Sequence, residues 1–155
     1  MANKGKPIPE GYHTVTPYMM LKEASRALDF YKQALGAVEL MRMAAPDGRI
    51  MHAEIRIGDS IIMIGQESPQ WPELRGVESF RGSPVNIYLY VEDVDALFNR
   101  AVAAGAKVKR PVTDEFYGDR VGGVEDPFGL VWWISTHKED LSAEEIGKRA
   151  ATAGH

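Results

Sequence analysis

The chain contains an internal repeat in which residues 70 positions apart have a similar character. The corresponding pairs are Thr16 and Asn86, Tyr18 and Tyr88, Leu21 and Val91, Leu28 and Phe98, and Met63 and Trp133. Near one pair of predicted helix ends the offset is 69, which relates Gly36 to Gly105. A short unit buries a smaller share of its surface than a longer chain does, so neither half forms a core alone as readily as the pair. We therefore expect two similar units in one chain.

Each half is predicted to have the order strand, helix, strand, strand, strand. Alternating apolar residues bounded by Gly, Pro and Asp indicate strands, and apolar residues at helical spacing indicate helices. The first half has predicted strands at 15–21, 37–44, 50–57 and 60–65 and a helix at 23–36. The second has predicted strands at 85–91, 107–112, 119–125 and 130–135 and a helix at 93–106. Ser142 and Glu145 have the spacing of a capping box, which predicts a final short helix.

These elements divide the chain into five predicted segments. They are a flexible N-terminus (1–12), a first βαβββ module (13–66), a connecting loop (67–84), a second module (85–137), and a C-terminal helix and tail (138–155). The loop carries Trp71 and Phe80 among prolines and charged residues. These two side chains either cover a binding site or pack against a partner chain.

Composition excludes several classes of function. The chain has no cysteine, so it has no disulfide, thiolate metal site or cysteine nucleophile. Its net charge is −4 without a sustained basic run, which argues against a nucleic-acid or membrane partner. No apolar run has the roughly 18–20 residues that span a bilayer, and the polar start is unlike a secretory signal. We expect a cytoplasmic protein.

Several stretches resemble one known superfamily. They are VTPYMML with ALDFYKQALGA, PDGRIMHAEIRIGDSIIMI, YLYVEDVDALFNRAVAAGAKV, and RPVTDEFYGDRVGGVEDPFGLVWWISTH followed by EDLSAEE. Together they resemble the vicinal oxygen chelate superfamily (glyoxalase, bleomycin resistance, dioxygenase), and within it the PhnB-like branch. The resemblance implies an α+β fold in which two tandem βαβββ modules form an eight-stranded open, curved, barrel-like sheet around a cleft, with a short C-terminal helix. It also implies a homodimer.

The resemblance places the metal positions of metal-dependent members at Thr16, Met63, Asn86 and Trp133. Divalent ions prefer carboxylate, imidazole and amide oxygen ligands, whereas thioether and indole groups serve poorly. We therefore expect no metal at these positions, no cofactor, and no metal-dependent glyoxalase activity.

A weaker metal or catalytic alternative is the pair His52 and Glu54, which share one face of a predicted strand. In the alternative interpretation, these two polar residues have no catalytic or metal-binding role and face solvent or a partner chain. In that case Met51, Ala53, Ile55 and Ile57 face the core.

The two adjacent tryptophans of the last strand point to opposite faces. Because Trp133 occupies a metal position, its side chain is expected to face the cleft. The neighbouring Trp132 side chain is then expected to pack beneath the helices. The predicted ligand-binding residues are Thr16, Tyr18, Met63, Asn86, Tyr88, Tyr117 and Trp133.

Such a wall suits a small aromatic or hydrophobic molecule that stacks on Trp133 and is oriented by Asn86 and Thr16. We expect binding or sequestration of such a molecule. One alternative is a metal-dependent lyase, isomerase or dioxygenase centred on His52 and Glu54. Another is a ligand-free dimeric interaction protein whose cleft is filled by its own side chains.

Overall fold

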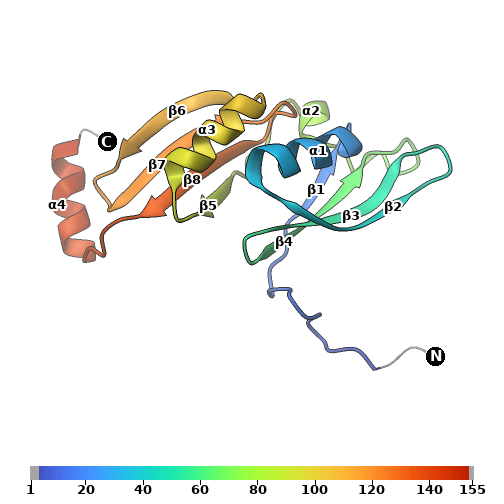
Figure 1. The fold of residues 1–155 in the computed structure, drawn as a ribbon, viewed down its shortest axis with the longest axis horizontal. Coiled ribbons are helices and arrows are strands. Elements are labelled where there is room, and N and C mark those ends of the chain that lie inside the picture. Colours follow the sequence, from blue (N-terminus) through green and yellow to red (C-terminus); the bar gives the residue numbers. More distant parts are fainter. Residues whose placement is uncertain (1–3, 154–155) are drawn as a thin grey trace. The chain divides into compact units, whose positions relative to one another are not determined.

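The computed structural model describes residues 4–153 (Figure 1). Residues 1–3 of the predicted N-terminus and residues 154–155 of the predicted tail lie outside the described residues. The chain divides into two compact units, and the boundary falls between Gly82 and Ser83.

Unit 1 is a four-stranded sheet covered on one face by a helix (Figure 1). Its elements are β1 (Tyr18–Leu21), α1 (Ala24–Leu35), β2 (Val38–Ala44), β3 (Ile50–Ile57) and β4 (Ser60–Gln66), followed by the short helix α2 (Val77–Phe80). The strand order is β1-β4-β3-β2, with β1 parallel to β4 and the other pairs antiparallel. The apolar side of α1 packs on this sheet, and it consists of Ala24, Ala27, Leu28, Tyr31, Ala34 and Leu35.

Unit 2 repeats this topology. Its elements are β5 (Ile87–Tyr90), α3 (Val94–Ala104), β6 (Lys107–Asp114), β7 (Asp119–Glu125), β8 (Val131–His137) and α4 (Ala143–Ala153). The strand order is β5-β8-β7-β6, and β5 is parallel to β8. The prediction of an α+β chain with two tandem βαβββ modules, eight strands and a C-terminal helix is confirmed.

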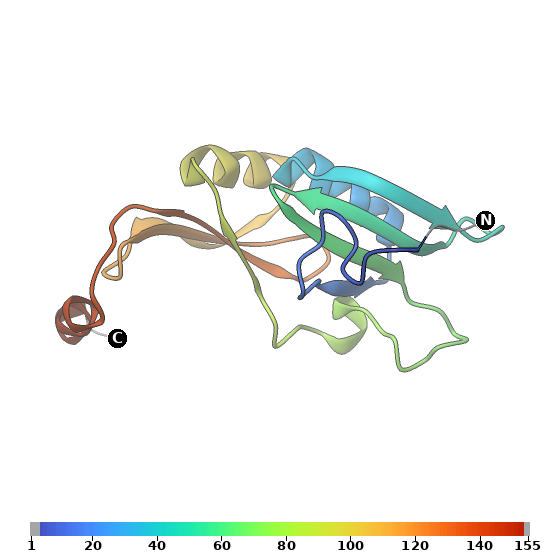
Figure 2. The same cartoon turned by 90° about the horizontal axis from the view of Figure 1, so that it is seen from below.

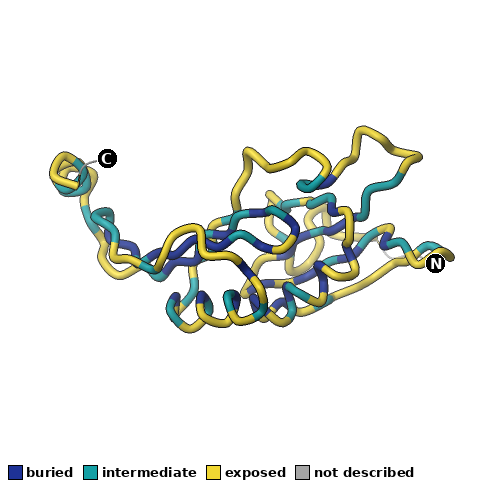
Figure 3. The backbone as a smooth tube through the Cα atoms, turned by 90° about the horizontal axis from the view of Figure 1, so that it is seen from above, coloured by how far each residue is buried: buried dark blue, intermediate teal, exposed yellow. Residues whose placement is uncertain are grey.

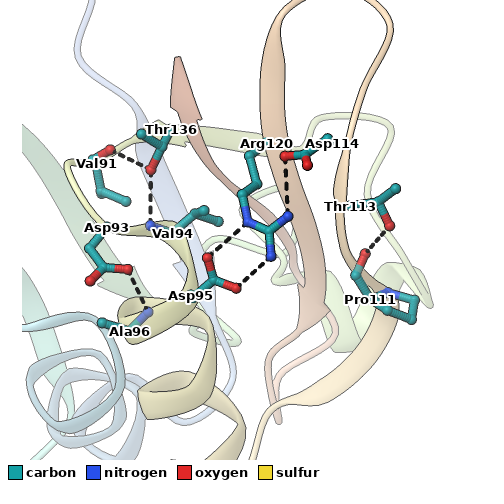
Figure 4. Close-up of polar contacts among 10 residues, drawn as sticks. All are labelled: Val91, Asp93, Val94, Asp95, Ala96, Pro111, Thr113, Asp114, Arg120 and Thr136. Atoms are coloured by element: carbon teal, nitrogen blue, oxygen red, sulfur yellow. Dashed lines mark hydrogen bonds and ion pairs between the residues drawn. The ribbon is translucent and has the colours of Figure 1, made fainter. Parts of the chain in front are cut away.

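Helix α3 is held in place by side chains at its first turn (Figure 4). The Asp93 carboxylate accepts a hydrogen bond from the Ala96 amide at 3.0 Å, which caps the helix. The Arg120 guanidinium on β7 binds both carboxylate oxygens of Asp95 at 2.9 Å and reaches Asp114 on β6 at 3.1 Å. This fork therefore joins the start of α3 to two strands of its own sheet.

Trp132 lies in the core of unit 2 because the preceding turn offers its indole a buried acceptor. The Asp126 carboxylate accepts from the amides of Phe128 and Leu130 at 2.9 and 3.0 Å, and from the Trp132 indole nitrogen at 2.9 Å. A buried indole needs such a partner. Trp132 is only 1% exposed, which confirms that it is a core residue.

Strand β3 departs from strict alternation at its start. Ala53, Ile55 and Ile57 are buried as predicted, but Met51 is 45% exposed, so the prediction that it faces the core is wrong. The register between β2 and β3 shifts between Met43 and Ala44, opposite this part of β3. Met51 is the extra residue of this bulge: His52 pairs with Met43 and Ile50 with Ala44, so the register skips Met51 and the alternation changes there.

Two further differences lie at the edges of the elements. Strand β1 begins at Tyr18 rather than at Val15, which is 83% exposed. The connecting loop contains α2, which apolar periodicity cannot reveal in four residues. Buried positions run along β3, β4, β7 and β8 and the inner sides of α1 and α3, whereas α4 has no buried residue (Figure 3).

Candidate functional site

In unit 1 the predicted site residues lie on the sheet face that points away from α1. Tyr18 on β1 pairs with Met63 on β4, and Met63 pairs with Glu54 on β3, so the three form one row across the sheet. The Tyr18 hydroxyl lies over Gly65, where an added Cβ would be 2.8 Å from it. The Tyr18 ring thereby crosses β4 and lies 5.8 Å, centroid to centroid, from the His52 ring.

A pocket of about 360 Å³ opens beside this row. Part of its wall belongs to residues 4–17, the described segment before β1, which forms no helix or strand and lies across the sheet (Figure 2). The lining residues are Pro7, Ile8, Pro9, Tyr12, His13, Thr14, Thr16, Glu54 and Met63. Two of the predicted ligand-binding residues, Thr16 and Met63, thus line one pocket.

Glu54 is the polar centre of this face. It accepts a hydrogen bond from the Tyr12 hydroxyl, and its second carboxylate oxygen lies 3.1 Å from Nε2 of His52. The Tyr12 bond is the main reason why the pKa of Glu54 lies below its usual range, and the same bond raises the pKa of Tyr12 to about 12. Glu54 therefore stays ionised, and Tyr12 and His52 already take up both of its oxygens.

The arrangement gives little support to a metal site at His52 and Glu54. Among residues 4–153, no group of three or more His, Cys, Asp or Glu side chains could hold a metal ion. A protein metal site usually needs at least three such ligands. The pair thus lacks a third ligand from the described part of the chain.

In unit 2 an aromatic row lies on the face that points away from α3. Tyr88 on β5 pairs with Trp133 on β8, and Trp133 pairs with Gly123 on β7. An added Cβ on Gly123 would lie 2.5 Å from Cζ3 of the Trp133 indole, so the indole lies directly on the Gly123 backbone. Unlike Trp132, Trp133 remains partly exposed.

At one end of this row a buried carboxylate gathers hydrogen-bond donors. Asp119 is 5% exposed and accepts from the hydroxyls of Tyr88 and Tyr90 at 2.9 and 3.2 Å. Nδ1 of His137 lies 2.7 Å from its other oxygen, and Nε2 of His137 lies 2.8 Å from Asp140. The tyrosine and histidine side chains are therefore oriented by one acid.

This cluster shifts the pKa values of its members. Burial raises the pKa of Asp119, but the hydrogen bonds from His137, Tyr88 and Tyr90 outweigh it, so the net shift is downward. The bonds to Asp119 and Asp140 raise the pKa of His137. Burial also raises the pKa of Tyr88, which keeps this hydroxyl protonated.

The hydrogen-bonding roles of Asp119 and His137 were not predicted from the sequence. They are 18 residues apart and belong to no motif. In the antiparallel pairing of β7 with β8 these two residues are directly opposite. A correct alignment of the two predicted strands would therefore have placed them together.

Other predicted residues lie at the margins of the two faces. Asn86 is exposed just before β5. The Thr16 hydroxyl, just before β1, donates to the carbonyl of His13 at 3.4 Å. Tyr117 is half-buried, edge-on to Phe116 and in side-chain hydrogen-bond contact with Tyr88, and burial raises its pKa. In unit 2 the structure thus brings Tyr117 to Tyr88, which is paired with Trp133.

The side chains at the four metal positions do not fit a divalent ion. Met63 presents a thioether between Tyr18 and Glu54 in the row. The Trp133 indole lies against Gly123 and has no basic lone pair. Thr16 and Asn86 are the remaining two, and neutral oxygens alone bind such ions weakly.

The protein thus consists of two βαβββ units. At the positions where metal-dependent members of the family bind their ion, it carries the thioether of Met63 and the indole of Trp133. The profile of the Glyoxalase/Bleomycin resistance protein/Dioxygenase superfamily matches residues 13–134, and the chain belongs to this superfamily. The resemblance inferred from the sequence is thereby confirmed.

Relatives and solved structures agree with this assignment. Protein Mb0911c of Mycobacterium bovis is 38% identical over 142 residues, which cover 90% of this chain and 93% of the relative. TioX from Micromonospora sp. ML1 superposes with a TM-score of 0.63 at 26% identity, over 84% of this chain and 100% of TioX. A PhnB protein from Bacillus cereus shares the fold, with a TM-score of 0.61 at 14% identity over 80% of this chain and 99% of that protein.

Within residues 4–153, no helix has the length and apolar character needed to cross a membrane.

Proposed function

We propose that this protein binds a small planar aromatic or hydrophobic molecule without a metal ion and acts by sequestering it. The observation that carries the proposal is the position of Trp133. Its indole lies on the Gly123 backbone beside Tyr88 and keeps part of its surface exposed. A ring fixed in this way offers a flat apolar surface on which a planar molecule stacks.

The tyrosine hydroxyls beside Trp133 give the site polarity. Tyr88 and Tyr90 each use their proton to bond Asp119, so a hydrogen bond from a ligand to either oxygen is one that the oxygen accepts. We expect a ligand that combines a planar ring with an N–H or O–H donor. In unit 2, Asn86 is the proposed orienting residue; the predicted residues Thr16, Met63 and Tyr18 belong to the separate face of unit 1. Sequestration requires affinity and abundance but no catalytic group.

The test uses the indole N–H resonances of the three tryptophans, Trp71, Trp132 and Trp133. Each is assigned in ¹H–¹⁵N spectra of the full chain with a Trp→Phe variant. We then titrate indole and 2-naphthol, which are planar aromatic molecules with one hydrogen-bond donor. Cyclohexanol has the donor, but its saturated ring is not planar and cannot stack. The Trp133 resonance should shift saturably with the planar probes and not with cyclohexanol.

Two variants at tryptophans of different exposure serve as site variant and control. Trp133→Leu removes the stacking surface and should weaken binding of the planar probes about tenfold. Trp71→Leu removes an indole that is 59% exposed in the connecting loop and should leave the affinity unchanged. A Trp133 resonance that responds to none of the probes would overturn the proposal and favour a ligand-free interaction protein.

A further inference from the structure

Unit 1 contains a second pocket, which shares no lining residue with the one beside Met63. It has a volume of about 360 Å³ and is formed where the chain leaves β1 and β4. Its lining residues are Lys22, Glu67, Ser68, Pro69, Pro72 and Arg75. All of them except Lys22 belong to the connecting loop, and none of them takes part in the proposed function.

The loop is fixed at this place by hydrogen bonds and by one close backbone approach. The Glu67 amide donates to the Leu21 carbonyl at 3.0 Å, which extends the pairing of β4 with β1. The Glu67 carboxylate accepts from the Gly76 amide at 2.7 Å and from the Ser79 hydroxyl at 2.8 Å. An added Cβ on Gly76 would lie 2.8 Å from the Met20 carbonyl oxygen, so the loop backbone lies directly on β1. The pocket wall is thus built into the unit.

The charges of the lining leave a positive excess. Lys22 and Arg75 contribute two positive charges and Glu67 contributes one negative charge. The Gly76 amide is the main cause that lowers the pKa of Glu67, so this carboxylate stays ionised while its oxygens bond the loop. Within the described residues, neither Lys22 nor Arg75 lies within 4.0 Å of a carboxylate oxygen. The lining residues therefore carry one positive charge in excess.

Arg75 is held in place by an aromatic ring. Its guanidinium carbon lies over the Phe80 ring, 4.4 Å from the ring centroid. The guanidinium group carries five N–H donors. Those donors match the two oxygens of a carboxylate. Pro69 and Pro72 supply apolar wall in the same pocket.

We propose that this pocket binds the carboxylate of a small organic monoanion with a compact apolar body. The carboxylate would lie between the Arg75 guanidinium and the Lys22 ammonium, and the apolar body would pack on Pro69 and Pro72. A monoanion fits the single positive charge in excess better than a doubly charged phosphoryl group does. This site is independent of the aromatic row on unit 2 and stands or falls separately from the proposed function.

The experiment is a titration of the ¹⁵N-labelled full chain with benzoate, followed by backbone amide shifts. The expected result is saturable shifts at Lys22, Ser68 and Arg75 at benzoate concentrations up to about 10 mM, where a ligand of millimolar Kd is mostly bound. Benzyl alcohol has the same ring without the charge and should shift these amides far less. Equal shifts with benzyl alcohol, or none with benzoate, would overturn the proposal.

Charge variants decide whether the shifts come from this pocket. Lys22→Gln and Arg75→Gln should each weaken benzoate binding about tenfold or more, since each removes a charge-assisted contact. Lys109→Gln removes one positive charge from β6 in unit 2 and should leave the affinity unchanged. The unperturbed remainder of each spectrum shows that the variant is folded. Tighter binding of phenyl phosphate than of benzoate would overturn the assignment to a carboxylate.

Discussion

At Gly123 the absence of a side chain determines where the Trp133 indole lies. The two residues are paired on neighbouring strands, and the indole occupies the space that a Cβ would fill. Gly65 has the same relation to Tyr18 in unit 1. On both sheets, then, a glycine allows a large side chain of another strand to lie flat across the sheet, and the flat ring becomes part of the exposed face.

Gly123→Ala is therefore expected to displace Trp133. The new Cβ would lie 2.5 Å from Cζ3 of the indole, so the ring or the strand must move. We expect a loss of about 1–3 kcal/mol in the free energy of unfolding, the usual effect of overpacking, and a shift of the Trp133 indole resonance. Urea unfolding and the ¹H–¹⁵N spectrum measure the two effects. Gly147→Ala on α4, where nothing lies within 4 Å, is the matched control: it should not lower the free energy of unfolding, because alanine favours a helix, and it should leave the Trp133 resonance unchanged.

His137 and Asp119 form a pair whose contribution to stability depends on pH. The pKa of His137 is raised, so its contribution is complete below the ordinary histidine value of 6.5 and is lost as pH rises through the raised pKa. The pKa of Asp119 is lowered, so its contribution is complete above 3.8 and is lost as pH falls through the lowered pKa. The window of full contribution therefore lies between these two values.

We expect an NMR titration of the His137 ring to give a pKa above 6.5 and the Asp119→Asn variant to lower it. The stability difference between the wild type and His137→Ala should be largest near pH 5 and decrease above neutrality. A His137 pKa that does not respond to Asp119→Asn would contradict the pairing.

At the scale of elements, the sequence predicts most of what the structure contains, because strands and helices follow from local patterns. Helix α1 ends where Gly36 adopts a left-handed conformation with φ 67°, as its position after Leu35 indicates. The bulge that exposes Met51 was not predictable, because it arises from the pairing of β3 with β2 rather than from either strand alone.

In the candidate site, too, features that depend on a local pattern were predictable, and contacts between distant segments were not. Alternation along β8 separates Trp132 from Trp133, so their different burial was accessible from the sequence. The Asp119 cluster was not, since it joins residues of three strands and of the segment after β8. Likewise, nothing in the sequence around Glu54 shows that Tyr12 would reach it, because 42 residues separate the two.

Helix α4 has no buried residue, so its stability depends on contacts at its ends and on Arg149. The Ser142 hydroxyl accepts from the Glu145 amide at 3.1 Å, which confirms the predicted helix cap. Arg149 binds Glu145 at 3.1 Å, Glu139 at 3.3 Å and the Phe116 carbonyl at 3.4 Å. An 11-residue helix is marginal by itself, so these bonds fix α4 to the turn before β7.

Arg149→Gln is expected to increase hydrogen exchange in α4 and to leave exchange in β7 and β8 unchanged. Lys148→Gln breaks only an exposed pair with Glu144 and serves as the matched control. Native-state exchange followed by NMR or mass spectrometry measures both. Equal protection of α4 in the two variants would show that the contacts of Arg149 do not hold the helix.

At the scale of the whole molecule, one edge of the unit 1 sheet is unusually apolar. Strand β2 ends the strand order, and Val38, Leu40, Met41 and Met43 on it are 39–48% exposed. Exposed apolar edge strands favour association with another chain. This observation supports the expectation of a homodimer that the family resemblance provides.

We expect light scattering coupled to gel filtration to give twice the mass of the chain at micromolar concentration. Leu40→Lys with Met43→Lys places charges on β2 and should shift the equilibrium toward single chains, because a charged edge resists pairing. Lys107→Glu on β6, the corresponding strand of unit 2, tests whether any charge change has the same effect. A single-chain mass for the wild type would contradict the homodimer and leave β2 as an apolar edge without a partner.

The superfamily contains metal-dependent proteins, and the donor set of this chain predicts that it is not one of them. Purified protein is soaked with nickel, zinc, manganese and iron(II), desalted, and measured by elemental analysis. We expect far less than one ion per chain, because Met63 and Trp133 occupy two of the four metal positions. One retained ion per chain that disappears in His52→Ala would contradict the metal-free interpretation and locate the ion at Glu54. One retained ion that survives this substitution would contradict it too, and would show that the ion is held by residues other than His52.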